Sequence, residues 1–302
     1  MKLTPTLLLL GAIVSLVHAQ VTVVNDSAWS SPVANAYVGG SSGLNYYGSS
    51  GSTGNLSLTG DSSNLLTLTT GTSGRGLAVT FATQSLGSIG SSITAAATFQ
   101  ITGPLFTSTT NNFRIGLYDN SGGTAITANN FANTNNIFVG WNGYMAASSL
   151  DVADSTPSQI YEKVTDQIAI IGAVSTSGPP AVTYLTSIGN GGIDLSPAQT
   201  PILAVATNYT ASITITRIAD GVNIAYTLTG GALGETFSFD LDDTTAATTS
   251  FNTFALHVNS NTWTSTQLQS LQISAIPEPS TYAALAGLLA LGFVAWRRRQ
   301  TA

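Results

Sequence analysis

The 302-residue chain has no cysteine, only two histidines and very few charged residues. Without cysteine, disulfide bonds, thiolate metal sites and cysteine nucleophiles are all excluded. Stability must then come from a large core, which this length permits. Charged residues make up 7% of the chain, against roughly 25% in an average soluble domain. Polarity comes instead from serine, threonine, asparagine and 30 glycines, a composition that disfavours helices and suits β-strands.

Basic residues are especially rare between the two ends of the chain. Only Arg75, Arg114, Lys163 and Arg217 lie there, together with nearly all of the 14 acidic residues. Such an acidic body would be repelled by phosphate backbones, so we expect no binding to nucleic acid.

The N-terminus has the pattern of a secretory signal peptide over residues Met1 to Ala19. Lys2 precedes the apolar run Leu7 to Val17, which is too short to span a bilayer, and small residues precede Gln20. We therefore predict cleavage between Ala19 and Gln20. The alternative is a buried N-terminal helix.

The C-terminus combines a proline motif, an apolar stretch and a basic end. Pro277, Glu278, Pro279 and Ser280 precede the segment 281–296, which is followed by Arg297, Arg298 and Arg299. As a helix the apolar segment would be about 24 Å long, slightly short for a transmembrane span. Each arginine costs roughly 2.5–3.5 kcal/mol at the bilayer centre, so the cluster should stop transfer and stay cytoplasmic. A buried core helix, the alternative, does not explain three terminal arginines.

The two prolines around Glu278 favour a processing site, because neither can join a helix or a sheet ladder and the strip stays extended. In these residues the chain resembles the tails of PEP-CTERM proteins of Gram-negative bacteria. The resemblance implies recognition by an exosortase, a membrane-embedded transpeptidase-like enzyme that cleaves near the motif. It also implies passage through the inner membrane to the cell surface or extracellular matrix, in a setting of exopolysaccharide and biofilm.

Between the two ends, residues 20–275 alternate repeatedly between apolar and polar side chains, as β-strands do. The clearest runs lie in 113–117 and 211–229, and the second is split by Asp220-Gly221, a strong hairpin signal. One short helical turn is predicted near Ser158–Lys163. The expected fold is all-β: a two-sheet antiparallel sandwich of about a dozen strands, between signal peptide 1–19 and sorting tail 276–302.

The strand pattern also resembles a known fold family. The segments 112–120, 209–229 and 269–274 look like the jelly roll of concanavalin-like and laminarin-binding domains. The resemblance implies a jelly-roll sandwich and a connection to sugars. It supplies no catalytic signature.

Acidic residues do not form an obvious catalytic pair. A retaining glycosidase needs two carboxyl groups about 5–5.5 Å apart, as a Glu-x-Asp-x-x-Glu arrangement on a strand would supply, and neither Glu162 nor Glu235 lies in such an arrangement. The nearest cluster is Asp240, Asp242 and Asp243, which we interpret as a solvated turn or, alternatively, as a calcium site. No other cofactor is expected.

Two further motifs are weak. The stretch Gly39 to Gly43 matches the Gly-x-Ser-x-Gly nucleophile elbow, but more glycine and serine follow it where a helix is required. His257 alternates with Leu256 and Val258, so we expect it to face solvent, without a partner for a histidine metal site.

Aromatic residues are the best argument for binding, since flat rings stack on sugar faces. Trp141, Tyr144 and Trp263 are the candidates, with core packing as the ordinary alternative. The sequence therefore predicts an exported, non-catalytic surface or matrix protein. A carbohydrate-binding, lectin-like module associated with exopolysaccharide is the alternative.

Overall fold

In the computed structural model, the described residues are 20–33, 36–49, 56–70, 74–105, 113–129, 131, 136–148, 158–164, 186–189, 203–231, 233, 236–245, 247–259, 263–276, 287 and 291. All of the elements named in this part of the chain are β-strands except the short 3-10 helix η1 (Asn136–Phe138).

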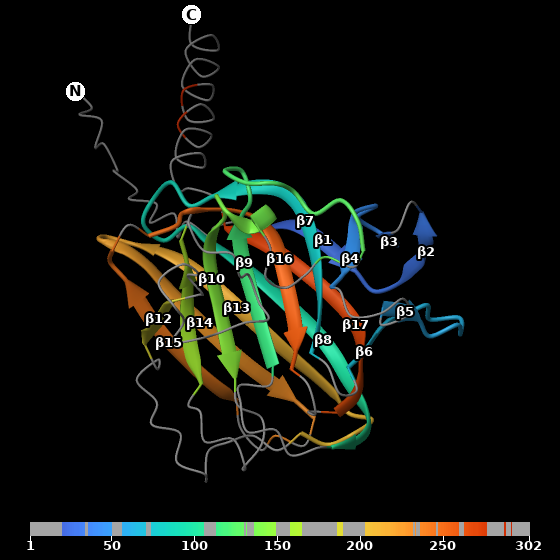
Figure 1. Cartoon of the computed structure of the whole chain (residues 1–302). Coiled ribbons are helices and arrows are strands. Elements are labelled where there is room, and N and C mark those ends of the chain that lie inside the picture. Colours follow the sequence, from blue (N-terminus) through green and yellow to red (C-terminus); the bar gives the residue numbers. More distant parts are fainter. Residues whose placement is uncertain are drawn as a thin grey trace, which may run out of the picture.

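Two large sheets face each other (Figure 1). Sheet A has the order β15-β14-β13-β8-β17-β6-β5, with β1 also paired to β17. Its strands are β1 (Val21–Asp26), β5 (Leu56–Leu58), β6 (Leu66–Thr69), β8 (Ser92–Leu105), β13 (Asn208–Ile218), β14 (Gly221–Gly230), β15 (Phe237–Asp243) and β17 (Trp263–Ile276).

Sheet B has the order β12-β11-β10-β9-β16-β7-β4-β3-β2. Its strands are β2 (Trp29–Val33), β3 (Ala36–Gly39), β4 (Asn45–Gly48), β7 (Arg75–Ser85), β9 (Phe113–Asp119), β10 (Asn142–Ser148), β11 (Gln159–Lys163), β12 (Thr186–Gly189) and β16 (Ser250–Val258). The named strands pair antiparallel throughout. The predicted two-sheet antiparallel sandwich is therefore confirmed, with more strands than the dozen expected.

The hairpin predicted at Asp220-Gly221 is confirmed. Strands β13 and β14 pair from Tyr209–Gly230 to Ile218–Gly221, so only two residues make the turn. Glycine is required at 221, because a Cβ there would lie 1.8 Å from the carbonyl oxygen of Asp243 on the neighbouring strand. Alternation along both strands buries one face, which includes Ile213 and Tyr226, against sheet B.

The main core fills the space between the sheets. Phe99 of sheet A stacks on Phe113 of sheet B with ring centroids 4.6 Å apart, and both side chains are fully buried. Burying one such side chain contributes roughly 1.5–3 kcal/mol.

A second apolar layer covers the outer face of sheet B. Phe138 and Trp141, in and beside η1, pack there against Tyr118 and Met145. Both faces of the central strands are consequently buried, and every residue from Phe251 to Val258 is buried. The prediction that His257 faces solvent is therefore wrong. It does point away from Leu256 and Val258, but it is only 1% exposed because its face of the sheet is covered.

The outer face of sheet A is polar and has few charges. Threonine hydroxyls pair across its strands, Thr94 with Thr214 at 2.9 Å and Thr98 with Thr210 at 2.9 Å. Such hydroxyl pairs stabilise neighbouring strands by a fraction of a kcal/mol each, roughly 0.2–1 kcal/mol. They keep this face of the sheet hydrated with few charged residues.

The helical turn predicted near Ser158–Lys163 is wrong. Residues Gln159–Lys163 form β11 and pair with β10, because alternation puts Ile160 and Tyr161 into the two apolar layers on opposite faces of the sheet.

Both predicted end segments fall outside the described residues. None of residues 1–19 is described, and only Gly287 and Leu291 are described in 277–302. Within the part of the chain that the structure describes, no helix is long and apolar enough to cross a membrane. The signal peptide and the transmembrane helix stay predictions.

Candidate functional site

A polar cleft of about 390 Å³ opens at one end of the sandwich. It lies where β9 ends, β10 begins, β11 ends and the chain enters β16. The lining residues are Asp119, Asn142, Glu162, Val164, Ala247, Thr248, Thr249 and Ser250. Two carboxylates, one amide and three hydroxyls therefore face a common space.

Sheet register brings the cleft residues together from distant parts of the sequence. Asn142 pairs with Asp119, and Tyr144 pairs with Glu162. Alternation places Asp119 on the same face as the buried Ile115 and Leu117. The core-facing rows of these strands thus change from apolar to polar at this end, where the cleft lies.

Glu162 is the most perturbed carboxyl of the cleft. Burial, and then the negative charge of Asp243, raise the pKa of Glu162 to about 7. The side chain is part-buried and can be either a donor or an acceptor near neutral pH.

Tyr144 and Asp243 lie near Glu162 and are hydrogen-bonded to each other. The Tyr144 hydroxyl donates to Asp243 Oδ2 at 2.6 Å and accepts from the Thr248 backbone N–H at 3.0 Å. The Thr245 N–H donates to Asp243 Oδ1 at 2.9 Å. Burial, hydrogen bonding to Asp243 and the charge of Asp243 raise the pKa of Tyr144 far above its ordinary value. These bonds tie the two sheets together and hold the 245–248 segment at the cleft.

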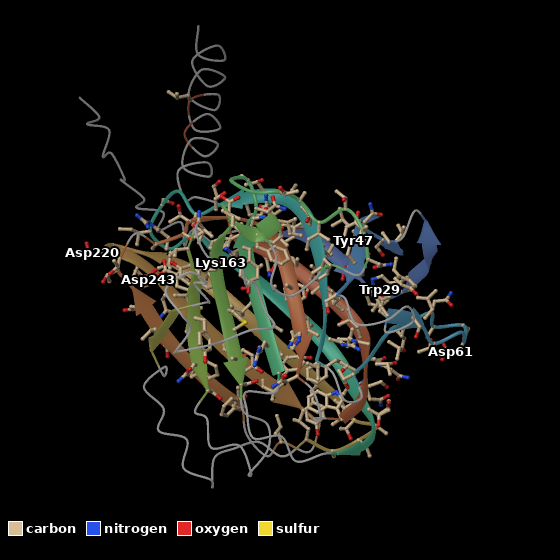
Figure 2. All side chains as sticks on the ribbon, in the orientation of Figure 1. Trp29, Tyr47, Asp61, Lys163, Asp220 and Asp243 are labelled. Atoms are coloured by element: carbon tan, nitrogen blue, oxygen red, sulfur yellow. The ribbon has the colours of Figure 1, made fainter. Side chains whose placement is uncertain are left out.

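Lys163, next to Glu162 on β11, points to the opposite face of sheet B. Its side chain is fully buried, and its Nζ donates to the carbonyl oxygens of Trp141 at 3.1 Å and Val164 at 3.3 Å. Figure 2 shows Lys163 and Asp243 at the same end of the sandwich.

The three aromatic residues proposed from the sequence for sugar stacking are all in the core. Trp141 and Tyr144 are fully buried and Trp263 is 1% exposed. Trp141 donates through Nε1 to the Thr124 carbonyl at 3.1 Å, and Trp263 donates to Thr266 Oγ1 at 2.7 Å. None of the three lines the cleft; Tyr144 is linked to it only through the hydrogen bond from the Thr248 backbone N–H, and none of the three presents a ring face to solvent.

The three aspartates proposed as a calcium site do not converge. Asp240 and Asp242 are exposed, and both accept from Asn223 Nδ2, at 3.0 and 2.8 Å. Asp243 points the other way, toward Tyr144. Among the described residues, no group of three His, Cys, Asp or Glu side chains could hold a metal ion.

The Gly39 to Gly43 segment encloses a buried carboxylate. The backbone N–H groups of Ser41 and Ser42 donate to Asp26 Oδ1 at 3.0 and 2.8 Å, and the Tyr46 hydroxyl donates to Oδ2 at 2.8 Å. The strand β4 follows the segment, so the helix of a nucleophile elbow is absent there, as the sequence indicated.

Sequence reasoning missed Asp119, Asn142 and the 248–250 hydroxyls, and set Glu162 aside. The pattern expected for a carboxylate pair puts both residues on one strand, at i and i+2 or i+4, whereas the residues that share the cleft with Glu162 come from other strands. The sequence does contain a signal for the cleft. Asp119 follows Ile115 and Leu117 on one face of its strand, and Glu162 follows Ile160 in the same way.

Comparison with known proteins gives one match to a family model and several matches to solved structures. Among solved structures, peanut lectin with a nine-residue peptide has 9% identity and a TM-score of 0.46, covering 85% of this chain and 97% of the lectin. Arcelin-5, a lectin-like defence protein from Phaseolus vulgaris, has 11% identity and a TM-score of 0.46, covering 85% and 98%. Lectin II from Ulex europaeus has 9% identity and a TM-score of 0.46, covering 84% and 98%. At such low identity the likeness concerns the fold alone.

No curated protein matches the chain. The family model described as PEP-CTERM protein-sorting motif matches residues 275–299. The match agrees with the motif, apolar segment and arginines found in the sequence. The chain therefore carries a PEP-CTERM sorting motif at its C-terminal end, which indicates an exported protein sorted to the cell surface.

Proposed function

We propose that this protein is a non-catalytic component of the cell surface or extracellular matrix, delivered there through its C-terminal tail. The observation that carries the proposal is the match of residues 275–299 to the sorting motif. Pro277, Glu278, Pro279 and Ser280 form the strip that an exosortase recognises. The segment 281–296 then crosses the inner membrane, with Arg297 to Arg299 stopping transfer on the cytoplasmic side.

The body supports a passive role. Its charge-poor sheet face and hydroxyl pairs suit a hydrated matrix, and buried polar side chains such as Asp26, Asn120 and Lys163 are hydrogen-bonded within the protein. Among the described residues, the only histidine lies in the core, so no histidine reaches the cleft to act as a base.

Mass analysis of protein extracted from the cell surface tests the sorting step. We expect a C-terminus at or near Pro277–Ser280, without Arg297 to Arg299. Glu278→Ala should retain the tail, whereas Glu235→Ala, a glutamate outside the motif, should be processed normally. A mature protein that still ends with the three arginines would refute processing and leave a plain membrane anchor.

A second candidate function is carbohydrate binding in the cleft. Asp119, Asn142 and the hydroxyls of residues 248–250 offer the acceptors and donors that sugar hydroxyls pair with. Among the described residues that line the cleft none is aromatic, so binding by these residues would rest on hydrogen bonds.

Retention of the detergent-solubilised full chain on a panel of immobilised polysaccharides tests this candidate. Asn142→Ala and Asp119→Asn should weaken retention, while Asn223→Ala, on the outer face of sheet A, should not. Equal retention of all three variants and the unmodified chain, or no retention at all, would exclude the cleft as a sugar site.

A further inference from the structure

The sorting tail leaves the sandwich from a strand inside sheet A. Strand β17 runs to Ile276, directly before Pro277. Near its end it is paired on both sides, Ile276 with Ser92 of β8 and Ala275 with Val21 of β1. The last described residue before the tail motif, Ile276, is therefore held at a fixed point of the fold.

The register shows which end of the sandwich this is. Ser92 pairs with Thr216, Thr216 with Asn223, and Asn223 with Asp242. Four strand spacings of about 4.8 Å put Ile276 about 19 Å from Asp242. The opposite end of β17, at Trp263, lies about 44 Å away along the strand. We call the end that holds Ile276 the tail end.

The polar cleft opens at the tail end too. Asp243 follows Asp242 and bonds to Tyr144, whose hydroxyl holds the Thr248 N–H at the cleft. Figure 2 shows Asp220, Asp243 and Lys163 together at this end. The cleft therefore lies beside the attachment point.

The strip between the fold and the apolar segment is short. Residues 277–280 span at most about 14 Å when fully extended, less than the distance across the tail end itself. A domain fixed so close to a bilayer keeps its tail end toward the lipid.

Charge at the tail end opposes direct contact with lipid. Among the described residues there, Asp119, Glu162, Asp220 and Asp242 reach solvent, and the Arg217 side chain is partly covered and donates to the Gly221 carbonyl at 3.3 Å. Anionic headgroups repel such a surface within about 10 Å. This repulsion favours a gap between the tail end and the lipid.

We propose that the tail end of the sandwich faces the membrane while the tail is intact, so that the cleft opens into the narrow gap between protein and lipid. The cleft then meets extracellular polymer only after the tail has been cut. The inference rests on the proposed anchoring by segment 281–296. It adds to that function a defined orientation and an order of events, with processing before binding.

The absence of cysteine allows a direct test with single-cysteine variants of the full chain. Ile89→Cys lies at the tail end, in the loop whose Gly90 N–H donates to the Arg217 carbonyl. Val205→Cys lies at the opposite end, next to Ala206, which donates to the Ile101 carbonyl. The two side chains are 64% and 47% exposed, so neither change disturbs the core. Thr249→Cys reports on the cleft itself.

Each variant is labelled with a fluorophore and reconstituted into vesicles of phosphatidylethanolamine and phosphatidylglycerol that carry a headgroup-bound quencher. We expect several-fold stronger quenching at positions 89 and 249 than at 205, with the difference lost in a chain ending at Ile276. Flotation with equal quenching at all three positions, or stronger quenching at 205, overturns the orientation alone. Failure of the full chain to float with the vesicles would show that segment 281–296 does not anchor it. That outcome would refute both the anchoring and the orientation.

Discussion

Two ionisable side chains, Glu162 and His257, make stability depend on pH in opposite senses. The raised pKa of Glu162 means that the folded state holds its proton more tightly than the unfolded chain does. Its contribution to stability is therefore lost as pH rises from about 4.5 toward about 7. Burial, and then the charges of Arg114 and Arg75, hold the pKa of His257 well below its usual range. Stability from His257 is present above pH 6.5 and is lost as pH falls below it.

Glu162→Gln should remove the first effect and leave the second. Relative to the unmodified protein, the variant should gain free energy of unfolding as pH rises from about 4 to about 8. Chemical denaturation across this range measures the difference, and the contribution of His257 cancels in the comparison. Thr249→Ala, a cleft residue that does not titrate, is the control and should differ from the unmodified protein by a constant amount. A constant difference for Glu162→Gln as well would contradict the raised pKa.

Gly39 is required because of the carboxylate that its segment encloses. A Cβ at this position would lie 2.1 Å from Asp26 Oδ2 and 2.8 Å from Ser42 Oγ. Gly39→Ala should therefore lower the free energy of unfolding by about 1–3 kcal/mol. Ser41→Ala is the matched control, since the exposed Ser41 contributes its backbone N–H to Asp26. Unchanged stability of Gly39→Ala in a denaturant titration would argue against a tight enclosure.

At the scale of elements, the 136–141 segment acts as the cover of sheet B. Phe138 is fully buried. The centroid of its ring lies 5.0 Å from the ring centroid of Trp141 and 6.2 Å from that of Phe131. Phe138→Ala should cost about 3–5 kcal/mol. Val139→Ala, at a neighbouring position that is 43% exposed, should change stability by about 0.5 kcal/mol or less. Equal effects of the two changes on thermal unfolding would mean that the cover contributes little.

At the scale of the whole molecule, the two ends of the body complete the same sheet. Strand β1 pairs with β17 from Val21–Ala275 to Asp26–Leu271, and it supplies the Asp26 carboxylate. A chain that begins at Ser27 loses both and exposes the edge of β17 to pairing with other chains. We expect a lower melting temperature and association visible by light scattering. A chain beginning at Val21 is the control, and identical behaviour of the two chains would show that β1 is dispensable.

The sequence alone determined the features that depend on near neighbours. Alternation over a few residues predicts strands, Asp220-Gly221 predicts a hairpin, and the order of prolines, apolar segment and arginines marks the sorting tail. Each of these is a local pattern, so no knowledge of distant contacts was needed.

Only the tertiary structure decided what covers each face of a strand and which strand ends meet. Alternation shows that His257 and Leu256 point in opposite directions, but not that both faces of sheet B are covered, one by the main core and the other by a second apolar layer. The same limit applies to Trp141, which was a candidate for stacking and is part of that layer. The cleft joins Asp119, Asn142, Glu162 and Thr248 from four separate segments. Their proximity depends on long-range strand pairing, which no local pattern contains.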